Sequence, residues 1–507
     1  MDRARHLLKS SVIVILFLSL GKLTGLLRTW LISMEFGTSA EFDAFTAANQ
    51  LPEVFVTLIS GGALAAAFIP VYSNYLKSKS SKESARLANT VLTLVIAILG
   101  GISLLGIFFA PWITSNILVP DFPRETQILT ANLMRVILLQ TTLFGVSGVL
   151  SSVLNAHQHF ALPALAPVAL DLGYIFGLVV LVPVMGINGL AWGTVLGGIL
   201  HILIQVPALS RYRFRYRLNW ALNLAGTKEI IRLMGPRIVT LGTVQIADLV
   251  IIRITSGLSA GSTSGYFYGY YIMQLPETLI GTAIAIVVFP TMAEFFNAGK
   301  IEELKKLSIT ALRIIWLLAV PAALALVMLG RQAITVFFQR GAFTETSTAI
   351  VYSVLIFFSV RVISEASLEI LARLFYAQHN TKIPMYVAIG WLVVTVTLSF
   401  FLVGNIGIGG LALASTIAFT LQSVVLFFLN RHRLGELYGK QLLQTAGQAL
   451  LGALGMAAII FAAGQVISDD LLLLITGGAA GLAVYIGITY LAGSRELPAL
   501  VRLIRSN

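Results

Sequence analysis

The chain has 507 residues, of which 57% are hydrophobic and 11% charged, and its mean hydropathy is +0.89. This composition excludes an ordinary water-soluble domain, in which about a quarter of the residues are charged. The formal net charge is +12, but the basic residues are spread over many short hydrophilic segments, which excludes a single nucleic-acid-binding patch. Without cysteine, the chain forms neither disulfides nor thiolate metal sites.

Apolar runs of the length that spans ~30 Å of hydrocarbon recur along the whole chain. The first run continues past the about 7 to 15 apolar residues of a secretory signal, so we expect it to stay as the first membrane helix. We predict an all-α integral membrane protein of about fourteen transmembrane helices. The expected helices are 11–33, 43–74, 88–114, 127–154, 162–184, 187–209, 230–256, 265–296, 303–329, 347–377, 383–404, 408–430, 442–467 and 471–492.

Lysine and arginine alternate between the two sides of these predicted helices. The loops on the side of the N-terminus are basic, for example residues 77–86, 211–228 and 431–440, whereas the opposite loops carry little beyond Arg124, Arg331 and Arg340. Because cytoplasmic loops carry the excess of basic residues, this pattern predicts a multi-pass membrane protein with both termini cytoplasmic.

The chain also repeats part of its own sequence. The tetrapeptide Gln-Leu-Pro-Glu, which contains Pro52 in its first copy and Pro276 in its second, is followed each time by an aligned Phe-Ile-Pro or Val-Phe-Pro segment and a charged loop. Six helices separate the copies, so both halves have the same orientation and predict two parallel lobes with a substrate path between them. We expect the lobes to rock about Pro52 and Pro276. The predicted domains are 1–220 for the first six-helix lobe, 221–434 for the second, and 435–507 for two additional helices and a tail.

Charged residues within membrane helices are the candidates for function, because such residues normally face a cavity or a charged partner. Lys22 and Arg28 lie deep in the first helix, about 120° apart on a helix of 3.6 residues per turn. Two interpretations stay open: the long side chains extend to lipid headgroups, or they bind an anion such as a diphosphate through charge-assisted hydrogen bonds.

A second group of charges lies in the tenth helix, where Arg361, Glu365, Glu369 and Arg373 follow one another at i, i+4 spacing, so that each can pair with the next. This ladder is either a structural seam of ion pairs or the wall of a gate or cavity. The other candidates for gate or cavity charges are the seventh-helix residues Arg237, Asp248 and Arg253. Asp171 in the fifth helix is more typical of a hydrogen bond between packed helices.

Enzyme motifs are missing from the sequence. There is no Walker A motif, no HExxH pair and no GxSxG elbow, so we expect a transporter without a cofactor or a metal site.

The first two helices resemble the N-terminal signature of the MurJ (MviN) lipid II flippases, members of the multidrug/oligosaccharidyl-lipid/polysaccharide exporter superfamily. The matching residues are 21–28, 36–37 and 43–45, and the similarity continues through segments such as 67–70, 163–167, 234–236 and 382–384. The resemblance implies two six-helix lobes plus two helices. It also implies a protein of a bacterial cytoplasmic membrane that flips its substrate outward by alternating access. The implied substrate is undecaprenyl-diphosphate carrying a disaccharide-peptide, which serves peptidoglycan synthesis, cell-wall biogenesis and cell shape.

The resemblance also implies which residues bind the substrate. Family residues of the central cationic cavity correspond here to Lys22, Arg28 and Asp43, with lysine in place of the usual arginine at position 22. Other positions depart from the family, since Val56 and Tyr271 replace frequent arginines, Gly61 replaces a frequent glutamate and Thr29 replaces a frequent aspartate.

The expected partners are the lipid-linked precursor, membrane lipids and cell-wall synthesis proteins, with no nucleic acid. The alternatives are a flippase for another polyprenyl-linked glycan, of the O-antigen or capsule type, and a non-transporting cell-wall scaffold.

Overall fold

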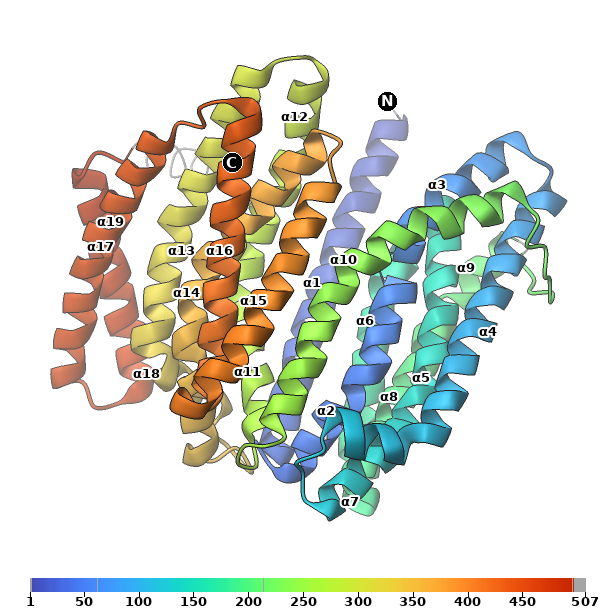
Figure 1. Ribbon diagram of the computed structural model, residues 1–507, viewed down its shortest axis with the longest axis horizontal. Coiled ribbons are helices and arrows are strands. Elements are labelled where there is room, and N and C mark those ends of the chain that lie inside the picture. Colours follow the sequence, from blue (N-terminus) through green and yellow to red (C-terminus); the bar gives the residue numbers. More distant parts are fainter. Residues whose placement is uncertain (1, 62, 213, 495, 497–507) are drawn as a thin grey trace. The chain divides into compact units, whose positions relative to one another are not determined.

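The computed structural model describes residues 2–61, 63–212, 214–494 and 496 (Figure 1). Within these ranges every regular element is a helix. The chain divides into two compact units, Met1–Thr263 and Ser264–Asn507, and each is described separately.

Twelve helices are long and apolar enough to span a membrane, and the bent helix α10 (Ala225–Thr255) makes thirteen if it counts as one span. With α1 (Asp2–Phe36), which the sequence predicts as the first span, this agrees with the expected number of about fourteen. The all-helical membrane fold is therefore confirmed for the described part of the chain.

Unit 1 is built around α5, which packs against α2, α4 and α8, while α1 packs along α6 and α10 along α3. The apolar core of this unit includes the fully buried side chains of Phe68, Leu87 and Leu99. After α1 the elements are α2 (Ala40–Phe55), α3 (Ala63–Ser78), α4 (Ser81–Ile113), α5 (Arg124–Ala156), α6 (Ala161–Phe176), α7 (Val182–Met185), α8 (Ile187–Leu203), α9 (Val206–Arg211) and α10, with π-helical turns η1 (Val56–Gly61), η2 (Thr114–Leu118) and η3 (Gly177–Leu181).

Helices α6 and α8 approach each other through glycines, and this contact holds α6 in place. A Cβ atom on Gly173 would lie 2.2 Å from the Cα of Gly197, and one on Gly177 would lie 2.5 Å from the Cα of Gly193. The spacing of four residues brings these glycines to one face of each helix, as in the small-residue motifs of membrane helix pairs. The close contact fixes the position of α6, which carries Asp171 and Tyr174.

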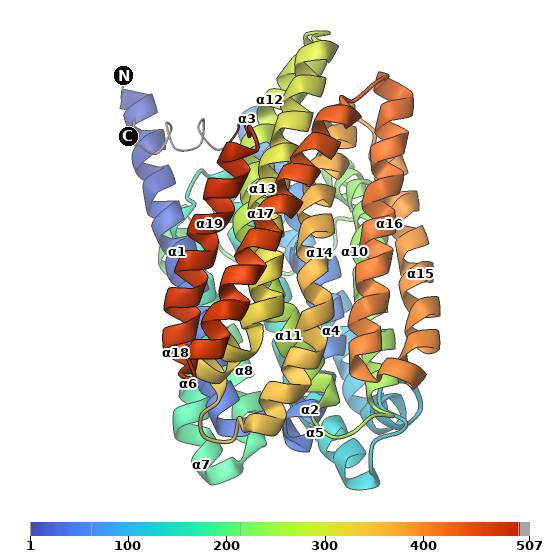
Figure 2. The ribbon, with the colours of Figure 1, turned by 90° about the vertical axis from the view of Figure 1, so that its left-hand side faces the viewer.

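Unit 2 is built around α14, which packs against α13 and α16, while α15 packs along α16. Its last two helices, α17 and α19, lie side by side (Figure 2) and pack on α13, where the buried Tyr485 hydroxyl donates to the Leu317 carbonyl at 2.8 Å. The elements are α11 (Ser262–Glu277), η4 (Thr278–Thr282), α12 (Ala283–Asn297), α13 (Ile301–Phe338), α14 (Glu345–Ala377), α15 (Lys382–Ile406), α16 (Ile408–Leu434), α17 (Gly439–Val466), α18 (Asp470–Leu472), η5 (Leu473–Gly477) and α19 (Gly478–Leu491).

The two copies of the repeated tetrapeptide have the same local structure. Pro52 lies within α2, three residues before its end, and the π-helical turn η1 follows; Pro276 lies one residue before the end of α11, and η4 follows. Proline perturbs the turn that precedes it, so each π-helical turn, which comes after the proline, needs a further cause. Each unit thus has a π-helical turn in a membrane helix close to the position where the sequence predicts a hinge, and that hinge stays a prediction.

The compact units do not end where the predicted lobes end. The helix α10 packs against α3 and α2 and belongs to unit 1, although the repeat assigns it to the second lobe. The lobe boundaries at residues 220 and 434 describe the duplication of the sequence and stay a prediction.

Candidate functional site

The signature segment of α1 presents one face to α6. Gly21, Thr24, Gly25 and Arg28 are spaced at i, i+3, i+4 and i+7, which places them on one side of a helix. A Cβ on Gly21 would lie 3.6 Å from the side chain of Pro167, and one on Gly25 would lie 3.6 Å from the carboxylate of Asp171. The small residues of the signature therefore bring the α1 backbone close to α6 and place Arg28 against its polar side chains.

Asp171 is the anchor of this contact. Its Oδ1 lies 2.9 Å from Nη1 of Arg28, and its Oδ2 accepts a hydrogen bond of 2.6 Å from the Thr24 hydroxyl. The Asp171 side chain is only 6% exposed, so its ion pair with Arg28 is shielded from solvent on the side of the carboxylate. The hydrogen bond between packed helices is present as expected, but the sequence did not reveal that Asp171 also forms an ion pair with Arg28.

Arg28 keeps most of its hydrogen-bonding capacity. Its guanidinium lies over the ring of Tyr174, 4.7 Å from the centroid, and its side chain is 28% exposed. A guanidinium has five N–H donors, and within the described residues one ion pair, to Asp171, engages them. Glu53 also lies within electrostatic range of Arg28. The arginine is therefore held in position by an anion and a ring while donors stay available for a second anion.

Lys22 points away from this contact. It is exposed, and among the described residues no ion pair or hydrogen bond involves its ammonium group. The predicted divergence of Lys22 and Arg28 on α1 therefore agrees with their surroundings, since one faces α6 and the other does not. Their role in binding substrate stays a prediction.

Asp43 has a different environment from the two cations. It is 2% exposed in the first turn of α2, and its Oδ2 accepts a hydrogen bond of 2.6 Å from the backbone amide of Gly261. Gly261 has a φ of +88°, and a Cβ there would lie 2.5 Å from the Thr38 carbonyl oxygen, so the loop before α11 requires glycine at this point. This contact gives Asp43 a structural role in unit 1, and its predicted role in substrate binding is not tested by it.

The charges of α14 form two separate pairs. Nε of Arg361 donates to Glu365 at 2.7 Å, and Nη1 of Arg361 donates to the Ser415 hydroxyl of α16 at 2.9 Å. The guanidinium also lies 3.9 Å from the ring centroid of Phe419, and the side chain is only 7% exposed. Arg361 is thus enclosed on all sides within unit 2.

The second pair joins Arg373 and Glu369. The expectation that each residue of the ladder pairs with the next is wrong at its centre, because Glu365 and Glu369 are both acidic and repel each other. Glu277, which no charge pattern of the sequence singled out, is 4% exposed and interacts electrostatically with both glutamates and with Arg361. The Thr282 hydroxyl donates to Glu277 at 3.3 Å. The cluster therefore contains more carboxylates than the ladder alone suggests.

The seventh-helix candidates have separate surroundings. Arg253 donates to the carbonyls of Asn116 and Ile117 at 3.1 and 3.0 Å. These two carbonyl groups of η2 therefore have a hydrogen-bond partner on α10. Arg237 is exposed and Asp248 is half-buried on α10. Arg253 therefore has a structural partner, while the gating role predicted for the three residues stays a prediction.

Another buried ion pair escaped the sequence analysis. Arg313 of α13 lies 2.7 Å from Glu496 and donates to the Thr445 hydroxyl of α17 at 2.7 Å. It ties the two additional helices to the rest of unit 2. Glu496 lies beyond the end of the predicted helix 471–492, so nothing in the sequence pattern indicated a partner for Arg313 within the predicted helix 303–329. In the described part of the chain no group of three or more histidine, aspartate or glutamate side chains is placed to hold a metal ion.

A scan of family models matches residues 32–476 to the lipid II flippase MurJ family. The match covers most of the chain. The protein belongs to this family. Two curated relatives are a probable lipid II flippase MurJ of Buchnera aphidicola subsp. Acyrthosiphon pisum, 30% identical over 81% of both chains, and one of Bdellovibrio bacteriovorus, 28% identical over 98% of this chain and 97% of the relative. The family assignment confirms a transporter rather than an enzyme.

Solved structures share the fold. A lipid II flippase MurJ in an inward closed conformation superposes with a TM-score of 0.82 at 23% identity, covering 97% of this chain and 100% of the other. An inward-facing multidrug resistance transporter of the MATE family superposes with a TM-score of 0.71 at 16% identity, covering 84% and 98%. The chain therefore shares the fold of these two transporters.

Proposed function

We propose that this chain translocates lipid II, the undecaprenyl-diphosphate-linked peptidoglycan precursor, from the inner to the outer face of the cytoplasmic membrane by alternating access. Membership of the lipid II flippase family supports the substrate class. The observation that carries the proposal is the state of Arg28, which is positioned by Asp171 and Tyr174 yet partly exposed. A guanidinium in this state fits a phosphate, which accepts paired hydrogen bonds from its planar donors.

In this mechanism the diphosphate binds to donors of Arg28 that Asp171 does not use. Lys22, exposed on the adjoining face of α1, supplies a second charge without fixed geometry. Lysine there lacks the bidentate fork of the arginine that the family usually has, so Arg28 carries the orientation of the substrate. The widened turns after Pro52 and Pro276 are the places where helix bending accompanies the change of access.

A second candidate is a flippase for another polyprenyl-linked glycan. Val56 begins η1 and Tyr271 is 49% exposed on α11, and neither supplies the cation that the family often has there. Fewer cations favour a substrate whose headgroup carries less negative charge than a diphosphate with an acidic peptide. The shared polyprenyl-diphosphate still requires Arg28, so both candidates predict the same role for this residue.

The decisive experiment replaces the native lipid II flippase of a bacterium by this protein in a depletion strain. We expect growth to be rescued and lipid II to become accessible on the outer face of the membrane. Failure to rescue by a protein shown to be inserted and stable contradicts the lipid II proposal. Rescue of an O-antigen or capsule flippase mutant instead assigns the second substrate, and rescue of growth without outward lipid II supports a scaffold.

A further inference from the structure

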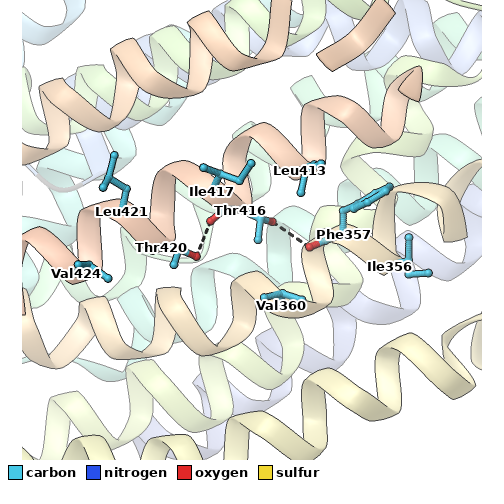
Figure 3. Close-up of a pocket in the computed structure, with 9 residues that line it drawn as sticks. All are labelled: Ile356, Phe357, Val360, Leu413, Thr416, Ile417, Thr420, Leu421 and Val424. Atoms are coloured by element: carbon cyan, nitrogen blue, oxygen red, sulfur yellow. Dashed lines mark hydrogen bonds between the residues drawn. The ribbon is translucent and has the colours of Figure 1, made fainter. Parts of the chain in front are cut away.

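A groove lies between α14 and α16 of unit 2 (Figure 3). It encloses about 460 Å³. The lining residues are Ile356, Phe357 and Val360 of α14 and Leu413, Thr416, Ile417, Thr420, Leu421 and Val424 of α16. Val360 and Ile417 are 51% and 41% exposed, whereas Arg361, next to Val360 on α14, is buried. The groove therefore opens on the side of the helix pair that does not carry Arg361.

The side chains that line the groove offer an occupant no free hydrogen-bond donor. Its only polar side chains are two threonines, and both hydroxyls are already used, since Thr416 donates to the Phe357 carbonyl at 3.0 Å and Thr420 to the Thr416 carbonyl at 2.8 Å (Figure 3). Both threonines then present their methyl groups to the groove. A surface of this kind on helices that span a membrane binds hydrocarbon and excludes a polar headgroup.

The exposed stripe of α16 continues from the groove to a cation. Ile417, Leu421, Val424 and Phe428 follow at steps of four, three and four residues, all more than 40% exposed, and Arg431 comes three residues later. At 100° per residue, Arg431 lies on the same face of α16 as the groove. It is exposed in the last turn of the helix, about 10 Å along the axis from Val424.

We propose that this groove and Arg431 form a binding site for an anionic phospholipid, with one acyl chain in the groove and the phosphate at Arg431. The positive-inside pattern assigns the Arg431 end of α16 to the cytoplasmic leaflet, where anionic headgroups attract basic residues next to a membrane helix. The site is separate from Arg28 and goes beyond the proposed flippase activity, because its occupant is a membrane lipid and not the transported substrate.

Arg433 provides the matched control. It lies two residues after Arg431 in the same last turn, and is also exposed, but it points about 200° around the helix from Arg431. A general attraction of basic residues to anionic membranes involves both arginines equally. A site with a seated acyl chain involves Arg431 alone.

Native mass spectrometry of the full chain in detergent, with phosphatidylglycerol and phosphatidylcholine of identical acyl chains, tests the proposal. We expect the first phosphatidylglycerol molecule to bind more tightly than the first phosphatidylcholine molecule. Arg431→Gln should weaken phosphatidylglycerol about tenfold, because a charge-assisted hydrogen bond to its phosphate is lost, and should weaken phosphatidylcholine less, because the quaternary ammonium of that headgroup offsets the charge of its phosphate. Arg433→Gln should leave the binding of both lipids unchanged. Ile417→Trp, which fills the groove at an exposed position, should weaken both lipids.

Equal weakening by Arg431→Gln and Arg433→Gln would overturn the proposal and leave only non-specific attraction at the helix end. An Ile417→Trp variant that binds both lipids as the unmodified protein does, or a protein without preference for phosphatidylglycerol, also contradicts it. Thermal unfolding of each variant without added lipid shows that the fold is intact, since all three substitutions are at exposed positions.

Discussion

Both units contain a buried ion pair around an arginine of a membrane helix, but the two arginines differ in what is left for a ligand. Arg28 forms one ion pair and keeps a side chain that is 28% exposed. Arg361 is bonded to Glu365 and Ser415, is covered by Phe419, and is 7% exposed. The first arrangement leaves donors for a ligand, as the proposed diphosphate binding requires, whereas the contacts of Arg361 are those expected of a structural group. We therefore expect a charge within a membrane helix to bind substrate only where its donors stay free.

The largest effect on stability is expected for Arg361→Gln. Removal of one partner leaves Glu365 charged and unpaired inside unit 2, so the free energy of unfolding should fall by about 3–5 kcal/mol. The double variant Arg361→Gln/Glu365→Gln removes the unpaired charge and should recover most of this loss. Unfolding by denaturant in mixed micelles measures both variants.

If the double variant also transports lipid at the normal rate, Arg361 is structural, as its burial indicates. A stable double variant without transport would show that the α14 pair takes part in binding or gating, and the contrast between the two units would fail.

For the Arg28–Asp171 pair of unit 1, removal of both charges should restore stability but not transport, in contrast to the Arg361–Glu365 pair. Arg28→Gln should reduce lipid transport about a hundredfold, because charge-assisted hydrogen bonds to the diphosphate are lost. The double variant Arg28→Gln/Asp171→Asn restores electroneutrality and stability, but transport should stay low. Outward exposure of a labelled polyprenyl-diphosphate lipid in proteoliposomes is the measurement. Recovered transport in the double variant would mean that Arg28 only neutralises Asp171.

The glycine contact between α6 and α8 should tolerate no side chain. In Gly177→Ala the new Cβ would lie 2.5 Å from the Cα of Gly193 and 2.8 Å from the Gly189 carbonyl oxygen, so backbone must move. We expect a loss of about 1–3 kcal/mol in the free energy of unfolding, typical of overpacking. Gly390→Ala on α15, where nothing lies within 4 Å of the added Cβ, is the control and should cost nothing. Equal effects of the two substitutions would refute the close contact.

The smallest effect is expected for an exposed ion pair. Arg331 and Glu345 lie 3.1 Å apart at the ends of α13 and α14, but their side chains are 53% and 75% exposed. Water and salt screen such pairs, so Arg331→Gln should change the free energy of unfolding by less than about 0.5 kcal/mol. The same unfolding assay applies. A loss as large as that of Arg361→Gln would contradict the conclusion that burial, and not pairing, distinguishes the two sites.

Much of the architecture followed from the sequence because membrane helices are dictated locally. A helix satisfies its own backbone hydrogen bonds, so the length of an apolar run is enough to predict a span. The duplicated segments around Pro52 and Pro276 likewise indicated two equivalent places, and each is followed by a π-helical turn. The four-residue spacing of Gly173 and Gly177 is also typical of closely packed membrane helices, so this contact could have been predicted as well.

The pairing of charges depended on contacts between distant segments. Thr24 and Asp171 are 147 residues apart in sequence, and Arg361 and Ser415 are 54 apart, so no helical spacing predicts either contact. Spacing on one helix did suggest the Arg361–Glu365 pair, but it also suggested contacts between Glu365 and Glu369 that like charge forbids. Sequence alone therefore determined the membrane helices and the short set of intramembrane charges, while the orientation in the membrane and the two lobes of the repeat stay predictions. Only the tertiary structure decided which arginine keeps free donors, because exposure and partner identity arise from packing between helices.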